Sequence, residues 1–133
     1  MLITHMQVFA LYAALNGLIV LLLALNVTRV RMSTKVMIGD GGDQRLLRAF
    51  RAHANAVEYV PLILVLLGAL AGMKASMLMI HIVGGLLTFG RILHAIGLTR
   101  SSGVSIGRGA GTLLTWIAFI VAIAGCFLYA LKA

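Results

Sequence analysis

The sequence predicts an all-α membrane protein, a bundle of four transmembrane helices in a single domain over residues 1–133. Of its residues, 62% are hydrophobic, and three acids stand against eleven Lys and Arg. Four apolar segments approach or exceed the roughly 20 residues that cross a bilayer. A soluble bundle would carry a polar stripe on each helix, and the first and fourth segments have almost none. Helices are therefore expected at about residues 4–28, 46–72, 76–98 and 107–131.

The first segment is interpreted as a true helix and not as a cleavable signal. It has no basic region in front of it, and its apolar run is long enough to span. The loop that follows contains "IGDGGD" (Ile38–Asp43), whose glycines and aspartates indicate a turn. A phosphate loop is disfavoured there, because no Lys-Ser/Thr follows and the acids would repel phosphate.

The other connections complete the bundle. "AGMKAS" (Ala71–Ser76) is short, so the second and third helices are expected to be antiparallel neighbours. "TRSSGVSIGRG" (Thr99–Gly109) is a basic loop between the third and fourth helices. Glycines recur in these last two helices, and small residues allow helices to approach closely in lipid.

The basic residues are distributed unevenly. Nine of the eleven Lys and Arg lie in or beside the first and third loops, and only Lys74 and Lys132 fall at the opposite side. The positive-inside rule then places both basic loops in the cytoplasm and both termini outside.

The second helix carries polar residues at a depth where lipid is expected. Arg51, Asn55 and Glu58 are spaced i, i+4 and i+7, so they share one face. The apolar run after Glu58, Tyr59 to Gly72, covers only about 21 Å of helix, too little to span alone. Asn55 and Glu58 therefore lie inside the slab, where a charge facing lipid costs on the order of 3 kcal/mol. They are expected to face protein or a water-filled pocket.

Several cations converge at the same level as Glu58. They are Arg29 and Arg31 at the end of the first helix, Arg91 and His94 on the third, and Arg108 at the start of the fourth. This excess suits an anionic ligand that carries one ammonium for Glu58. Two other interpretations stay open: the arginines of the first loop reach lipid headgroups, and Asn55 and Glu58 form a structural hydrogen bond. No His, Cys, Asp and Glu set has metal-ligand spacing, and the single Cys126 is expected to have a packing role.

Two stretches resemble a known family. "RAHANAVEYVP" (Arg51–Pro61) resembles the helix-two signature R-x-x-x-N-x-x-E-x-x-P of the MAPEG family, membrane-associated proteins in eicosanoid and glutathione metabolism. "FGRILHAIG" (Phe89–Gly97) resembles its helix-three signature, and the "GDGG" loop is similar to an uncharacterised bacterial branch. The resemblance covers essentially the whole chain.

The resemblance implies a homotrimer in a bacterial inner membrane that binds glutathione between adjacent subunits, at the cytoplasmic end. Glu58 matches the residue that holds the ligand ammonium, and Arg108 most nearly matches the arginine that stabilises the thiolate, with Arg100 of the same loop as the alternative. The other positions that match glutathione contacts are Arg29, Arg31, Arg51, Asn55, Tyr59, Arg91 and His94.

The implied activity is that of a glutathione transferase or peroxidase acting on apolar electrophiles or lipid hydroperoxides, with no metal. The sequence departs from family enzymes at Leu98, where a tyrosine is common, and at Gly109, where some members have serine. These departures leave the reaction type open. Two alternatives remain: a trimer that binds glutathione or lipid without chemistry, and a small multidrug exporter. The exporter is disfavoured, because arginines around Glu58 would repel a cationic substrate.

Overall fold

The computed structural model describes residues 3–100, 103 and 105–132, and these form four long helices. The helices are α1 (His5–Thr34), α2 (Gln44–Gly72), α3 (Met77–Arg100) and α4 (Ile106–Ala130). All four are long and apolar enough to cross a membrane. The predicted class, an all-helical membrane bundle of four helices, is confirmed at this level, and the homotrimer stays a prediction.

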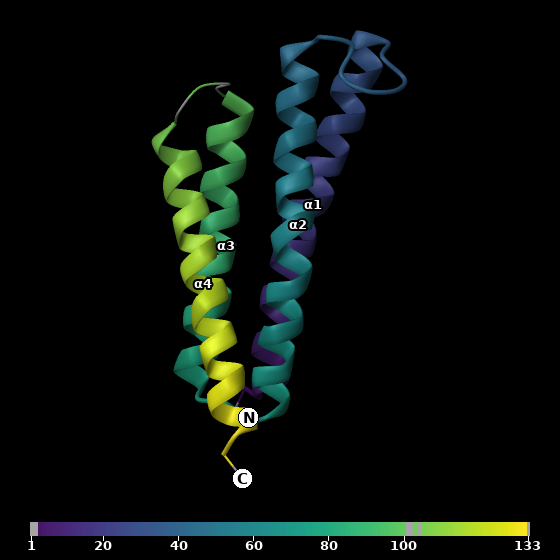
Figure 1. Ribbon diagram of the computed structural model, residues 1–133. Coiled ribbons are helices and arrows are strands. Elements are labelled where there is room, and N and C mark those ends of the chain that lie inside the picture. The colour runs from purple at the N-terminus through teal and green to yellow at the C-terminus, as the bar shows by residue number, and fades with distance from the viewer. Residues whose placement is uncertain (1–2, 101–102, 104, 133) are drawn as a thin grey trace.

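The helices are arranged as two hairpins (Figure 1). α1 and α2 lie side by side, and so do α3 and α4, with the α1–α2 and α3–α4 loops at one end of the bundle. Both termini and the α2–α3 turn lie at the other end. There the Tyr129 hydroxyl of α4 accepts a hydrogen bond from the backbone N–H of Ser76 (2.9 Å), which ties the last helix to that turn.

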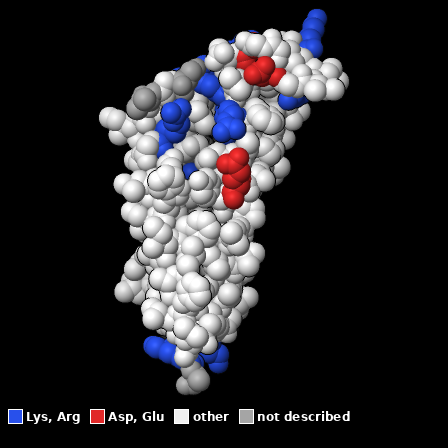
Figure 2. Space-filling model, viewed as in Figure 1, with Lys and Arg blue, Asp and Glu red and all other residues white. Residues whose placement is uncertain are grey.

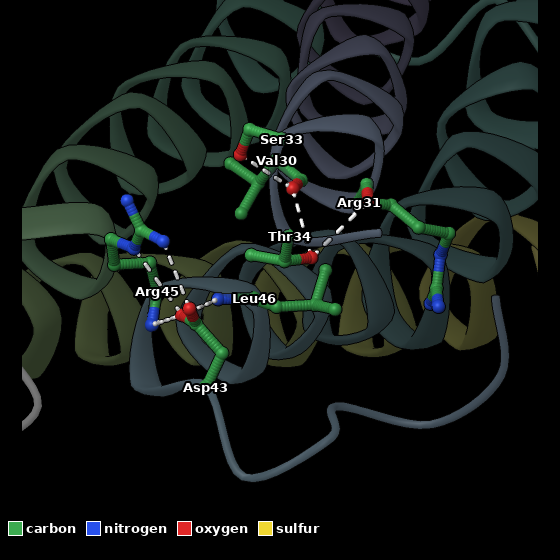
Figure 3. A network of polar contacts seen from close by, with 7 residues as sticks. All are labelled: Val30, Arg31, Ser33, Thr34, Asp43, Arg45 and Leu46. Atoms are coloured by element: carbon green, nitrogen blue, oxygen red, sulfur yellow. Dashed lines mark hydrogen bonds and ion pairs between the residues drawn. The ribbon is translucent and has the colours of Figure 1, made fainter. Parts of the chain in front are cut away.

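α1 continues past position 28 to Thr34, so Arg29 and Arg31 lie on the helix. The hydroxyls of Ser33 and Thr34 donate to the carbonyl of Val30 (2.8 and 3.1 Å), as the close view in Figure 3 shows. The helix ends where Lys35 adopts a left-handed conformation (φ 57°). The helix thus extends beyond its apolar run, and its last polar side chains bond to carbonyls of its own final turn.

Asp43 starts α2 at the other side of the same loop (Figure 3). Its carboxylate accepts hydrogen bonds from the backbone N–H groups of Arg45 (2.7 Å) and Leu46 (3.2 Å), which are unpaired donors of the first turn. It also pairs with the Arg45 guanidinium at 2.9 Å. The Arg45 hydrogen bond, followed by those from the backbone, lowers the pKa of Asp43 to about 2. The cap is therefore ionised at any physiological pH.

The core joins the two hairpins through fully buried aliphatic side chains. They are Ile63, Leu67 and Leu70 of α2, Ile80, Val83 and Leu87 of α3, and Ala118 and Ala122 of α4. α3 and α4 approach each other at glycines: a Cβ on Gly111 would stand 2.5 Å from the His94 nitrogen and 2.6 Å from the Gly90 oxygen. Glycine at that position is required by the close backbone approach.

On the face shown in Figure 2, charged side chains are concentrated toward the two ends of the bundle, and few lie between them. Lys and Arg gather at the loop end of the bundle and again, in smaller number, at the end that holds the termini. Large apolar side chains such as Leu21, Val65, Phe89 and Ile120 are more than half exposed between them. An exposed band of this kind matches the hydrocarbon of a bilayer.

Candidate functional site

A basic cleft of about 390 Å³ opens between α2, α3 and α4 near the loop end of the bundle. We use the name basic cleft for this cavity and its lining residues: Gln44, Leu47, Arg48, Arg51, Asn55, His94, Leu98 and Arg108. The volume falls within the range of small-molecule sites, roughly 300–1,000 Å³. Among the described residues that line it, three are arginines and none is acidic.

α2 supplies the longest wall of the basic cleft. Residues 44, 47, 48, 51 and 55 all line it and are spaced at helical intervals, so one face of the first three turns of α2 points into the cavity. The opposite face packs away through buried residues, among them Leu46, Ala49 and Ala52. The first half of α2 therefore has a largely polar face toward the cleft and an apolar face toward the core.

Arg91 of α3 is buried behind the cleft and connects the helices that form it. Its side chain is only 1% exposed and does not line the cleft. Its Nη1 donates to the Asn55 side-chain oxygen (2.8 Å), and its Nε donates to the Thr115 hydroxyl (3.1 Å). Arg91 therefore joins α2, α3 and α4 and fixes the orientation of the Asn55 amide.

Tyr59 belongs to the same cluster. The Arg91 guanidinium lies 5.8 Å from the centre of the Tyr59 ring, within the range of a cation–π contact. The Tyr59 hydroxyl accepts a hydrogen bond from the indole of Trp116 (3.2 Å). Arg91 also retains a buried Nη2 that has no hydrogen-bond partner within the described part of the chain. A buried donor of this kind is costly, since it has lost water without gaining an acceptor.

His94 and Arg108 form the wall opposite α2. His94 is buried where α3 meets α4 at Gly111. Arg108 lies in the first turn of α4, and its backbone N–H donates to the hydroxyl of the capping residue Ser105 (3.2 Å). The positive end of the α4 dipole and the Arg108 guanidinium therefore both favour an anion in the cleft.

Glu58 shares a helix face with Arg51 and Asn55, as its spacing predicts, but the pocket expected around it is not formed by the described residues of the single chain. It lies beside Arg51 and Asn55 in the helical register, yet its side chain is exposed and does not line the basic cleft. No hydrogen bond or ion pair to it occurs within the described residues of the single chain. It stands 14 residues from each end of α2, at the level of the apolar band. A charge at this depth calls for a partner, and the described part of the chain does not supply one.

The remaining arginines of the prediction lie outside the cleft of a single chain. Arg31 donates from Nη1 to the carbonyls of Val36 (3.0 Å) and Gly39 (3.1 Å), and it borders a smaller cavity that also contacts Arg51. Arg29 lies on another side of α1 and donates to Asn26 (3.2 Å). Arg100 is exposed at the end of α3. The structure thus brings together Arg51, Asn55, His94 and Arg108, with Arg91 and Tyr59 directly behind them.

Several residues of the site were not predicted. Gln44, Leu47 and Arg48 line the cleft, and Thr115 and Trp116 hold Arg91 and Tyr59. A signal for the first group existed, because positions 44, 48, 51 and 55 follow helical spacing. The sequence signal for Thr115 was weaker: it lies seven residues after Arg108 and hence on the same face of the fourth helix. Cys126 lies elsewhere, with its thiol 3.5 Å from the Leu66 carbonyl, which fits packing.

The cleft is suited chemically to a small anion with polar groups along its length. Three guanidiniums offer planar forks for carboxylates, and Asn55 and His94 offer further hydrogen bonds. Within the described residues, no group of three His, Cys, Asp or Glu side chains is placed to hold a metal ion. Fold and cleft together define a helical protein of the multi-pass membrane class, with a basic cleft near the loop end of its four-helix bundle.

Comparison with known proteins identifies the family. The model of the MAPEG family matches residues 9–128, and the chain belongs to this family. The protein named inner membrane protein YecN, from two strains of Escherichia coli, is 37% identical over 115 residues, which are 86% of this chain and 86% of that protein. No solved structure gives a significant match. The predicted family membership is confirmed.

Proposed function

We propose that this protein is a glutathione-dependent membrane transferase or peroxidase, which activates the thiolate of glutathione for attack on an apolar electrophile or a lipid hydroperoxide. The observation that carries the proposal is the basic cleft itself. Its three arginines face one cavity without an acidic residue in its described lining, and an unpartnered Glu58 stands beside it. Membership of a family named for glutathione metabolism supports the same ligand.

Glutathione matches the charges on this surface. It has two carboxylates, which suit Arg48 and Arg51, and one ammonium, which suits Glu58. The side-chain oxygen of Asn55 accepts a hydrogen bond from Arg91, which fixes the orientation of the amide. Its NH₂ group is therefore left to donate to a carbonyl of the ligand. The thiol would then lie toward α4 and Arg108.

Arg108 is the residue we assign to the reacting sulfur. A thiolate is the nucleophile, and a model thiol ionises near pH 8.5. Lowering that pKa by about two units requires roughly 2.7 kcal/mol of preferential thiolate stabilisation. A guanidinium at the positive end of a helix, in a partly desolvated cleft, can supply this amount. A membrane-soluble second substrate would reach the sulfur from the apolar band of the bundle.

The exposed Glu58 supports a homotrimer in which neighbouring chains complete each site. An unpaired carboxylate in the middle of α2 is unfavourable against lipid. A second copy packed on this face would shield it, and basic residues from the end of its α1, Arg31 or Arg29, would lie across the ligand. The trimer itself follows from the family resemblance.

We further propose that the protein lies in a bacterial inner membrane with the cleft on the cytoplasmic side and both termini outside. The name of the Escherichia coli relative supports the inner membrane, and the clustering of Lys and Arg at the loop end supports the orientation. A cysteine introduced at Gly41 of the α1–α2 loop is expected to resist an impermeant thiol reagent in intact cells, while one at Lys74 reacts. Labelling of Gly41→Cys from outside would reverse the orientation.

The activity is tested by a glutathione-dependent assay on the purified protein in nanodiscs. We expect either conjugation of an apolar aryl halide or reduction of a lipid hydroperoxide, each dependent on glutathione and absent with the thiol-blocked S-methyl analogue. Conjugation of the aryl halide would identify a transferase, and reduction of the hydroperoxide would identify a peroxidase. Tight binding of glutathione with no turnover of either class would favour the non-catalytic binding protein instead.

A further inference from the structure

A second, separate groove lies between α1 and α3. It has a volume of about 400 Å³, and its floor is apolar, formed by Ile19, Leu22 and Leu23 of α1 and by Ile92, Ala95 and Ile96 of α3. At the loop end the groove becomes polar, with Asn26, Arg29 and Thr99 at its rim. We call it the α1–α3 groove.

The rim of the α1–α3 groove continues into a basic pocket. Asn26, Arg29 and Thr99 also line an adjoining cavity of about 300 Å³, whose other charged residues are Arg45 and Arg48. The only acid bonded to this set within the described chain is Asp43, which pairs with Arg45. Three guanidiniums therefore face one carboxylate. The two cavities form one amphipathic surface, with an excess of positive charge above an apolar floor.

The length of the groove fits one leaflet of a bilayer. Ile19 and Arg29 are ten residues apart on α1, which is about 15 Å along the axis. Half of a hydrocarbon core of about 30 Å is the same length. An acyl chain lying on the apolar floor would thus reach the bilayer midplane while its headgroup stands at the arginines.

The α1–α3 groove is distinct from the basic cleft. The α1–α3 groove and the basic cleft share no lining residue. Arg48 lines both the basic pocket and the basic cleft. At about 100° per residue, positions 94 and 98 lie on one side of α3 and positions 92, 96 and 99 on the other. A molecule in the groove therefore occupies a different face of the bundle from glutathione.

We propose that the α1–α3 groove binds an anionic phospholipid of the membrane leaflet at the loop end. Its phosphate is held by Arg29 and Arg45 beside Asn26, and one acyl chain lies along the apolar floor. Arg29 gives one hydrogen bond within the described residues, to Asn26 at 3.2 Å, of the five that a guanidinium can donate. This site assigns Arg29 to lipid and leaves Arg31 as the α1 residue near the cleft; it does not depend on the identity of the thiol.

The test is a lipid titration of the intact purified assembly by native mass spectrometry, with phosphatidylglycerol and phosphatidylcholine of the same acyl chains. We expect phosphatidylglycerol to bind roughly tenfold more tightly or better, since each basic residue near a headgroup contributes about fivefold. Arg29→Gln should lower phosphatidylglycerol affinity about fivefold and leave phosphatidylcholine binding unchanged. Lys35→Gln removes a charge from the same end of α1 without touching the groove and should have little effect.

A matched pair of variants tests the apolar floor. Leu21 and Leu22 are neighbours on α1 with 54% and 56% exposure, and of the two only Leu22 lines the groove. Leu22→Trp should reduce the number of retained phosphatidylglycerol molecules, and Leu21→Trp should not. Equal affinity for the two lipids, or equal effects of the two tryptophans, would show ordinary lipid contact and overturn the proposal. Displacement of the lipid by millimolar inorganic phosphate would also overturn it, because a phosphate pocket needs no acyl chain.

Discussion

Replacing Arg108 by leucine is expected to lower glutathione-dependent turnover at neutral pH by about 10²-fold or more, the usual loss when one strong electrostatic donor is removed. Glutathione should still bind, because Arg51, Asn55 and Glu58 hold the rest of the ligand. Arg108 lies in the first turn of α4 with its side chain half-buried, so the bundle core is not disturbed. Turnover should recover toward the wild-type rate as the pH is raised, since free ionisation of the thiol then replaces the missing charge.

Two further variants separate charge from shape at this position. Arg108→Lys should recover part of the activity, because an ammonium keeps the charge but lacks the planar fork. Arg100→Leu removes an exposed arginine from the end of α3, outside the cleft. If Arg100→Leu loses activity and Arg108→Leu does not, the thiolate is stabilised from Arg100 instead.

Glu58→Gln is expected to weaken glutathione binding by about 2–5 kcal/mol, the cost of leaving one partner of a desolvated charge pair alone. The substitution keeps the shape of the side chain and removes the charge that would hold the ligand ammonium. Calorimetry on the protein in nanodiscs measures the change. Asp40→Asn, which removes an acid from the exposed α1–α2 loop, serves as a control and should bind normally.

The number of chains in the assembly is measured on the same preparation. Both the wild type and Glu58→Gln should have the mass of three chains in a mild detergent or a nanodisc. Unchanged glutathione affinity in Glu58→Gln would show that the ligand ammonium lies elsewhere. A mass of one or two chains in the wild type would remove the neighbouring subunit that the exposed Glu58 requires.

Much of the fold was predictable because the bilayer imposes strong constraints. Four apolar runs, two basic loops and one short turn are enough to order the helices, since a membrane admits few other solutions. The exact ends were less predictable. α1 continues to Thr34 through polar residues, where Ser33 and Thr34 bond back to Val30, and hydropathy does not record where such a helix ends.

The cleft was predictable in its chemistry and less so in its geometry. Helical spacing brings Arg51 and Asn55 onto one face, and the start of α4 brings Arg108 opposite them. The burial of Arg91 was not foreseen, because it depends on a threonine of α4 that accepts its hydrogen bond and on a close approach of α3 and α4 at Gly111. Such packing arises from pairs of residues distant in the chain.

Glu58 shows the limit of reasoning from one chain. Its spacing from Arg51 and Asn55 predicts a shared polar face, and its depth predicts a partner. The single bundle leaves it exposed, because Glu58 shares the face of Arg51 and Asn55 but lies beyond Asn55, the last residue of α2 that lines the cleft. Within the described residues nothing pairs with Glu58, so the partner that we propose for it is a ligand or another subunit.

The central claim is that the basic cleft binds glutathione as a thiolate, and an ultraviolet titration of the bound thiol tests it most directly. Glutathione saturating the wild-type protein in nanodiscs should develop thiolate absorbance about two pH units below a model thiol, which ionises near pH 8.5. With Arg108→Leu the titration should move back toward that value. Ionisation of the bound thiol at the same pH as in buffer, or at one pH in wild type and variant alike, would contradict the assignment of the cleft and of Arg108.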